Sequence, residues 1–167
     1  GEQWGRYSII GLPARQRLVI SGHHVQVFVD DQLVQEERDC ADPLAFVERY
    51  QAQFRVPEIT HLPRFTGGLV GYFGYDTVRL FEKKLAKVVK PDPIGLPDIQ
   101  LFLSEDVVVF DNLRESVFFI THVDPSQPNA YQQGQQRLQQ LATQLQTNTY
   151  PDMPLTDQVT RESDFVS

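Results

Sequence analysis

Short apolar segments bounded by glycine, proline and acidic residues recur along the chain and predict β-strands. Near the start, RYSIIGL at residues 6–12 is rich in β-branched residues and lies between a glycine and a proline. RLVISG at residues 17–22 and HHVQVFVDDQLVQEE at residues 23–37 follow, and Asp30 with Asp31 supplies a hairpin turn. We therefore expect this opening region to form an antiparallel meander.

Two stretches have the residue spacing of amphipathic helices. Asp42 and Pro43 mark the start of the first, because Asp can cap free backbone N–H groups and Pro at the first helical position loses no hydrogen bond. Its predicted apolar stripe comprises Leu44, Val47, Tyr50 and Phe54. The second helix is predicted from Asn129 to Gln146, with glutamines on its polar face and an apolar face of Tyr131, Leu138, Leu141 and Leu145.

The centre of the chain adds more strands and one short helix. GGLVGYFGY at residues 67–75 has the character of a strand, and DTVRLFEKKL at residues 76–85 that of a short helix capped by Asp76. Further strands are predicted from IQLFLSE (99–105), DVVVFDN (106–112) and SVFFITHVD (116–124), with a turn that favours a hairpin between the last two. This order of elements favours an α+β fold, with mostly antiparallel β-sheet and three main helices packed on the sheet.

The composition excludes several classes of protein. The 167 residues fit one ordinary domain, and a hydrophobic fraction of 41% is enough for a core. A formal net charge of −7 argues against a nucleic-acid partner, which would require clustered Lys and Arg. Cys40 is the only cysteine, so an intrachain disulfide is impossible and a reducing cytoplasm is the expected location. No apolar run approaches the roughly 20 residues that span a bilayer, so no membrane partner is expected.

The glycine-rich segment FTGGLVGYFGYD at residues 65–76 raises the question of phosphate binding. A phosphate-binding loop of the Walker type needs a Lys followed by Ser or Thr after its last glycine, and neither is present. The residues between the glycines are large and apolar, which suits a strand approached closely by another backbone. We therefore interpret four glycines as packing and backbone positions: Gly67, Gly68, Gly71 and Gly74.

The remaining reactive side chains form no catalytic set in the sequence. His23 and His24 are adjacent and point to opposite faces of a strand, so they cannot chelate one metal ion. Cys40 has no neighbours that mark it as a nucleophile. Three carboxylates flank strand ends, where they could serve a magnesium ion or acid–base chemistry but are more often ordinary turn residues: Glu105, Asp106 and Asp111. His61 and His122 are isolated in the sequence.

Several motifs, in the same order along almost the whole chain, resemble the N-terminal region of anthranilate synthase component I. They are GRYSIIGL (residues 5–12), LPRFTGGLVGYFGYDTVRLFE (62–82), LPDIQLFLSEDVVVFDN (96–112) and the closing ESDFVS (162–167). The chain also starts without Met, so we expect a fragment of a longer protein. The resemblance implies that residues 1–146 form a regulatory and scaffold domain. Residues 147–167 would be a linker into an absent C-terminal chorismate-binding domain.

The resemblance also implies a reaction and its participants. Component I converts chorismate into anthranilate and pyruvate for tryptophan biosynthesis, a lyase reaction that uses ammonia or glutamine-derived ammonia. The expected partners are the C-terminal domain of the same chain and a glutamine amidotransferase subunit. Mg²⁺ and the catalytic residues are expected in the absent C-terminal domain, so this fragment is expected to hold no catalytic residue, metal or cofactor and to be inactive alone.

Feedback control by tryptophan is the role that the resemblance implies for the N-terminal region. The candidate effector-binding residues are Gly5, Arg6, Tyr7 and Ser8. Ser8 can bond a carboxylate or an amine, and Tyr7 offers an aromatic wall. An ordinary strand with Ser8 facing solvent is the structural alternative. The functional alternatives are the related aminodeoxychorismate synthase component I and a stand-alone domain that binds a small molecule or a partner.

Overall fold

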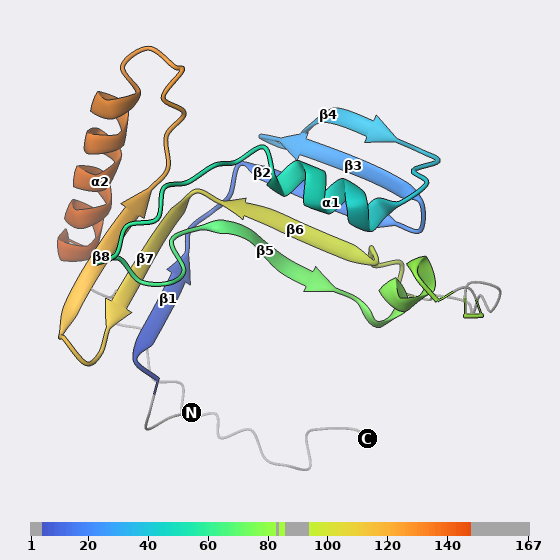
Figure 1. The fold of residues 1–167 in the computed structure, drawn as a ribbon. Coiled ribbons are helices and arrows are strands. Elements are labelled where there is room, and N and C mark those ends of the chain that lie inside the picture. Colours follow the sequence, from blue (N-terminus) through green and yellow to red (C-terminus); the bar gives the residue numbers. More distant parts are fainter. Residues whose placement is uncertain (1–4, 83, 86–93, 148–167) are drawn as a thin grey trace, which may run out of the picture.

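Two antiparallel β-sheets, joined side by side at an angle, organise the molecule (Figure 1). The computed structural model describes residues 5–82, 84–85 and 94–147. The smaller sheet has the order β1–β7–β8, with bounds Tyr7–Gly11, Asp106–Asp111 and Ser116–Thr121. The larger sheet has the order β4–β3–β2–β6–β5, with bounds Gln32–Glu37, His24–Val29, Gln16–Ser21, Ile99–Ser104 and Gly68–Phe73. The helices are α1 (Pro43–Gln51), the 3₁₀ helix η1 (Tyr75–Leu80) and α2 (Ala130–Thr147).

The expected α+β fold with mostly antiparallel sheet is confirmed. Strands β2, β3 and β4 form a meander as predicted, with Asp30 and Asp31 in the turn between β3 and β4 at φ angles of 49° and 62°. The expected meander is wrong for residues 6–12, because β1 pairs with β7 in the smaller sheet. Strands β7 and β8 form the predicted hairpin. The consecutive strands β6 and β7 do not pair, because Glu105 alone separates them and the chain changes sheets at that residue.

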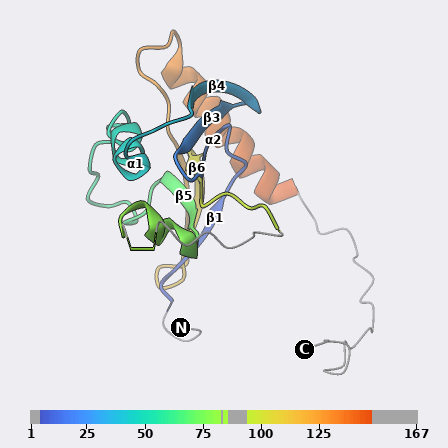
Figure 2. The same cartoon turned by 90° about the vertical axis from the view of Figure 1, so that its right-hand side faces the viewer.

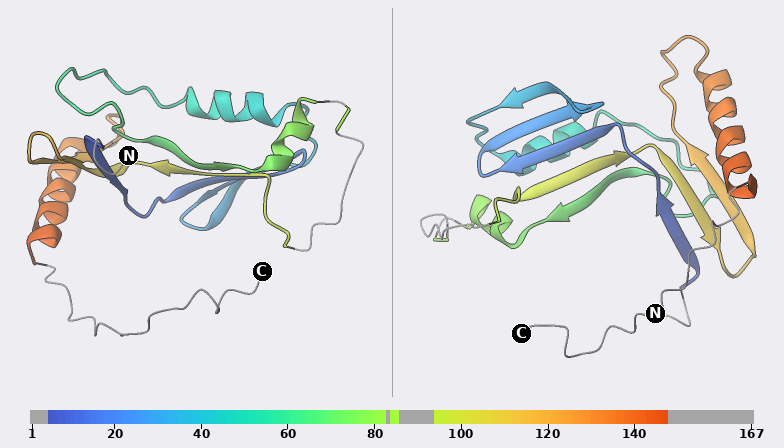
Figure 3. Two further views of the ribbon diagram at one scale, coloured as in Figure 1. Left: turned by 90° about the horizontal axis from the view of Figure 1, so that it is seen from below. Right: turned by 180° about the vertical axis from the view of Figure 1, so that it is seen from behind.

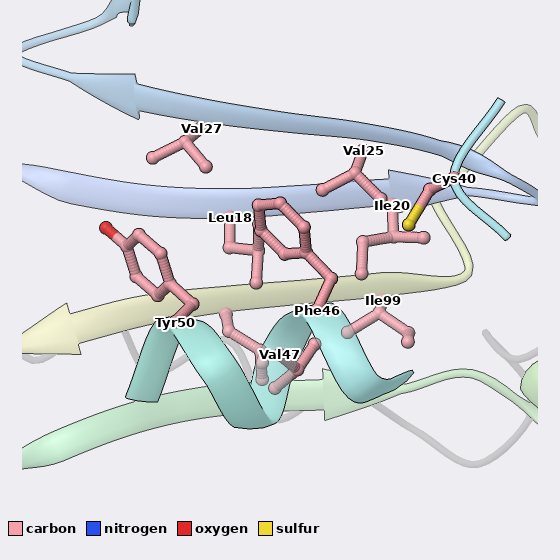
Figure 4. Close-up of a cluster of buried hydrophobic side chains, with 10 residues drawn as sticks. Leu18, Ile20, Val25, Val27, Cys40, Phe46, Val47, Tyr50 and Ile99 are labelled. Carbon is pink, nitrogen blue, oxygen red and sulfur yellow. The ribbon is translucent and has the colours of Figure 1, made fainter. Parts of the chain in front are cut away.

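Helix α1 builds the larger core against one face of the larger sheet. Its predicted start is confirmed, because Asp42 Oδ1 accepts a hydrogen bond of 2.9 Å from the Ala45 backbone N–H. The helix ends at Gln51, so Phe54 lies beyond it and is 40% exposed, and the predicted stripe is wrong at that position. Figure 4 shows the resulting core between helix and sheet, with these labelled residues: Leu18, Ile20, Val25, Val27, Cys40, Phe46, Val47, Tyr50 and Ile99.

Helix α2 packs on the smaller sheet, on the opposite side of the molecule from α1 (Figure 2; Figure 3, left). Leu141 is 5% exposed, as the predicted apolar face requires. Tyr131 is 73% exposed and Leu145 51%, so the prediction is wrong for these two residues. Gly134 lies on the buried side instead, and a Cβ there would lie 3.2 Å from Val123 Cγ1. The helix therefore approaches β8 through a small residue that the apolar pattern does not reveal.

The short helix after β5 begins one residue earlier than predicted and is a 3₁₀ helix. Gly74 is its N-cap and makes no side-chain capping bond. Asp76 lies within the first turn, where its Oδ1 is 3.1 Å from Arg79 Nη2. The prediction that Asp76 caps this helix is therefore wrong. The predicted linker, residues 147–167, lies outside the described residues from position 148 onward.

The glycines in and beside β5 allow close packing. A Cβ on Gly71 would collide with the backbone oxygen of Gln100 on β6, and a Cβ on Gly74 would lie 3.0 Å from the Asp98 oxygen. Gly67 and Gly68 have φ angles of 141° and 119°, which side chains disfavour. The interpretation of these residues as packing and backbone positions is confirmed.

One face of the larger sheet is uncovered in the described part of the chain. Figure 3 (right) shows β2, β6 and β5 in front of α1, with no described helix over them. In register across the sheet, Val70 pairs with Phe102 and Tyr72 pairs with Gln100. Val70, Tyr72 and Phe102 are 46%, 39% and 38% exposed. We call the surface formed by these three residues the open face.

Candidate functional site

The four candidate effector residues lie at the start of β1, an edge strand of the smaller sheet. Tyr7 is half-buried and, like Phe65 and Phe118, packs against a smaller core of Val107, Val109 and Ile120. Ser8 is exposed on the other face of the strand. The structure thus brings the four residues together on one segment, but with Tyr7 and Ser8 on opposite sides of it.

Arg6 is held by a carboxylate from the distant end of β7. Its Nε and Nη2 atoms donate hydrogen bonds of 3.1 and 2.9 Å to Asp111 Oδ1 and Oδ2. The Asp111 side chain is only 1% exposed, whereas that of Arg6 is 40% exposed. The Arg6 hydrogen bonds and the backbone N–H groups of Leu113 and Arg114 hold the pKa of Asp111 below its ordinary value. The guanidinium also lies 4.8 Å from the centre of the Tyr7 ring.

Asn112, which no sequence motif marks as a candidate, fixes the rest of this segment. Its backbone N–H donates 2.8 Å to the Arg6 oxygen. Its Nδ2 donates 3.1 Å to the Gly5 oxygen and 3.2 Å to Ser8 Oγ. Ser8 Oγ accepts that bond, so its own O–H remains available to a ligand. The position of Asn112 at the end of the predicted strand DVVVFDN was the only signal in the sequence.

A cleft lies where the two sheets meet, at the end of the smaller sheet that is opposite Tyr7. Its volume is about 940 Å³, and we call it the junction cleft. The strand ends at Leu69 and Leu103 line it together with Phe54 from the segment after α1. Its polar lining includes Glu105 and His122, which no sequence motif links to each other.

Glu105 and His122 are neighbours across the turn between the sheets. The His122 backbone N–H donates 3.0 Å to the Glu105 oxygen, and His122 Nε2 lies 2.7 Å from the Thr66 oxygen. Burial raises the pKa of the Glu105 carboxyl, and nearby Arg15 partly offsets that effect. The sequence could not bring these groups together, because the contacts span the junction between two sheets.

The other carboxylates near strand ends do not join Glu105 in one site. Asp106 Oδ1 accepts 2.6 Å from Thr121 Oγ1, and its Oδ2 accepts 2.7 Å from Arg137 Nε on α2. Asp111 is bonded to Arg6 at the far end of β7. Each of these two carboxylates therefore has a structural ion pair of its own.

The adjacent histidines are separated as predicted, although His23 lies in the turn before β3 and only His24 belongs to that strand. His23 Nδ1 lies 2.7 Å from the Cys40 oxygen, and His24 Nε2 lies 2.8 Å from Glu36 Oε1. Cys40 is buried, and burial raises the pKa of its thiol. Among residues 5–82, 84–85 and 94–147, no three His, Cys, Asp or Glu side chains gather in a way that could hold a metal ion. Within the same ranges, no helix has the length and apolar character needed to cross a membrane.

Comparison with known protein families shows to which family this chain belongs. A sequence profile of the family described as chorismate binding enzyme matches residues 11–165. This chain belongs to the chorismate-binding enzyme family. Membership accounts for the order of motifs that runs from GRYSIIGL to ESDFVS.

Relatives within the chorismate-binding family are similar over most of this chain. Anthranilate synthase component 1 of Pseudomonas aeruginosa is 55% identical over 90% of the chain, and the chloroplastic anthranilate synthase alpha subunit 2 of Arabidopsis thaliana is 34% identical over 90%. The chain spans 30% and 25% of the length of these relatives. The crystal structure of anthranilate synthase component I from Streptococcus pneumoniae superimposes with a TM-score of 0.67 over 87% of this chain and 31% of that one, at 23% identity. The structural match supports the fold.

Proposed function

We propose that this chain is the N-terminal part of an anthranilate synthase component I. The whole protein would convert chorismate and ammonia, free or from glutamine, into anthranilate and pyruvate. The observation that carries the proposal is the 55% and 51% identity to Pseudomonas proteins named anthranilate synthase component 1, over 90% and 92% of the chain. A glutamine amidotransferase subunit would supply ammonia from glutamine, and the cytoplasm is the proposed location.

In this proposal the described part does not carry out the chemistry. Its best-placed carboxylates, Asp106 and Asp111, are already bonded to Arg137 and Arg6. We assign Mg²⁺, the chorismate site and the acid–base groups to the rest of the protein. The chain alone would then be inactive toward chorismate.

The first role that we propose for this part is to support the rest of the protein. The open face exposes Val70, Tyr72 and Phe102 side by side on a regular sheet. Apolar surface of this kind is normally covered in a complete protein. The chorismate-binding part of the same chain is the occupant that we propose.

The second role is a share in a tryptophan feedback site. The segment Gly5, Arg6, Tyr7 and Ser8 is anchored by Asp111 and Asn112, so its position is defined before a ligand arrives. The Ser8 hydroxyl and the exposed edge of β1 would provide polar contacts, while the rest of the protein would complete the pocket. Such an effector acts by binding one arrangement of the two parts more tightly than the other.

Calorimetric titration of tryptophan into the chain and into the full-length protein tests this role. We expect heat of binding with the full-length protein alone, and weaker binding after Ser8→Ala. Binding to the short chain with equal affinity would show a self-contained pocket and would favour the stand-alone domain. No binding to either would remove the effector role.

An assay of the product tests the reaction itself. The full-length protein should release anthranilate and pyruvate when given chorismate, Mg²⁺ and ammonia. Release of an aminodeoxychorismate instead would assign the chain to the related synthase. The short chain is expected to release neither.

A further inference from the structure

We propose that the junction cleft binds a small organic cation, with the Glu105 carboxylate as its counter-ion and His122 Nδ1 as a hydrogen-bond acceptor. The cleft is at the opposite end of the smaller sheet from the effector segment. The inference does not depend on the proposed function.

Glu105 is a half-buried carboxylate that lacks a direct partner within the described ranges. No described side chain or backbone N–H donates a hydrogen bond to it, and no described cation lies within ion-pair distance. The nearby Arg15 is already bonded to Asp30, with Nη2 2.6 Å from Oδ2. A carboxylate that has lost part of its hydration without gaining a partner is disfavoured, and a bound cation would supply the missing interaction.

His122, which also lines the junction cleft, carries a second acceptor. Its Nε2 lies 2.7 Å from the Thr66 carbonyl oxygen, and that atom accepts only, so Nε2 carries the proton. In the neutral ring, Nδ1 is therefore an acceptor, and no described residue donates to it. The backbone at Gly67 makes this arrangement possible, since a Cβ there would lie 2.8 Å from His122 Nε2 and 2.6 Å from the Ser104 oxygen.

The chemistry of the lining selects the class of ligand. Two solvent-facing acceptors without a described protein donor can both bind an N–H donor, and a positive charge on that donor strengthens both contacts. Phe54, Leu69 and Leu103 supply apolar surface for the body of the molecule. Arg55 also lines the cleft, but its side chain is exposed to solvent. An anionic ligand would be repelled by the carboxylates of Glu105 and Asp124, which line the same cleft. A primary amine on an apolar body fits these features best.

Several charged and titratable groups surround Glu105. Arg15 and Asp30 lie before β2 and after β3, and Tyr50 lies on α1. Asp106 and His122 lie beside it at the sheet junction. Burial is the largest influence on Glu105 and raises its pKa, so a bound ammonium should lower that pKa again.

Phenethylamine is a suitable probe, and phenethyl alcohol is its neutral counterpart. We expect calorimetry at neutral pH to show saturable binding of the amine to this chain and no comparable binding of the alcohol. Glu105→Gln should weaken amine binding by about tenfold, because one charge-assisted contact is lost. Glu48→Gln, which removes an exposed carboxylate on α1 outside the cleft, should leave the affinity unchanged.

Nuclear magnetic resonance of the His122 ring locates the bound amine. Addition of the amine to the unaltered chain should shift the Nδ1 signal and leave Nε2 protonated. Equal binding of amine and alcohol, an unchanged affinity in Glu105→Gln, or an unperturbed His122 ring would each overturn the proposal. Preferential binding of phenylacetate, the corresponding anion, would do so as well.

Discussion

The Arg6–Asp111 ion pair joins residues that lie 105 positions apart in the chain. We predict that Asp111→Asn lowers the melting temperature at neutral pH by roughly 5 °C, because the Arg6 guanidinium loses the buried carboxylate that binds it. The pKa of Asp111 is lowered in the folded state, so its contribution to stability is present above its ordinary pKa and is lost as pH falls through the folded-state value. The variant should therefore lose less stability than the original chain on acidification.

Thermal melting at a series of pH values from neutral to strongly acidic measures both the lower melting temperature of Asp111→Asn and its smaller loss of stability on acidification. Asp31→Asn is the matched control, since Asp31 pairs with Arg17 at 3.3 Å but its side chain is 91% exposed. We expect that control to melt close to the original chain at every pH. Parallel pH profiles for the original chain and Asp111→Asn would contradict the assigned role of the pair.

Gly71 is the glycine at which an added methyl group is least tolerable. We predict that Gly71→Ala costs about 2 kcal/mol or more, because the new Cβ overlaps the Gln100 backbone oxygen and must push β5 away from β6. Gly11→Ala is the control in another strand, where the nearest atom would be Ser104 Oγ at 3.8 Å. Urea unfolding of both variants gives the comparison, and equal losses would show that β5 adjusts without strain.

At the scale of elements, α2 depends on few buried side chains. We predict that Leu141→Ala costs about 2–3 kcal/mol, because this 5% exposed side chain fills the contact with the smaller sheet. Leu145→Ala should cost under about 0.5 kcal/mol, since Leu145 is 51% exposed on the same helix. Chemical unfolding followed by helical circular dichroism separates the two, and similar losses would contradict the described packing.

Local patterns predicted most elements, because strands and helix starts depend on neighbouring residues. Asp42 caps α1 through a residue three positions away, and the turn at Asp30 and Asp31 is equally local. The errors occur where a distant surface decides burial. Tyr131 has helical spacing with Leu138, yet β8 contacts the helix through Gly134 instead.

The same limit applies to the candidate sites. GRYS could be singled out as a segment, but its partners Asp111 and Asn112 lie 105 and 104 positions after Arg6 and Ser8. The junction cleft depends on two sheets meeting at Glu105, which no spacing in the sequence encodes. The alternation of apolar and polar residues also does not show which strands pair, so it could not predict that β1 pairs with β7 and not with β2.

At the scale of the whole molecule, the open face distinguishes this chain from the longer protein that we propose. Hydroxyl-radical labelling should modify Tyr72 and Phe102 several-fold less in the full-length protein, because its remaining part would cover them. Tyr131, which is 73% exposed on α2, is the internal control and should be labelled equally in both. Equal labelling of Tyr72 and Phe102 would contradict the proposed contact.

The pairing of β1 with β7 has a consequence for how the protein is made. Ribosomes add about 5–20 residues each second, so Arg6 emerges roughly 5–20 s before the Asp111 that binds it. During that interval β1 has no partner within the smaller sheet, and its residues Ile9 and Ile10 remain available to other chains. Closing so long a loop also slows folding. Newly synthesised chains would thus depend on chaperones most strongly while translation passes through the segment between β1 and β7.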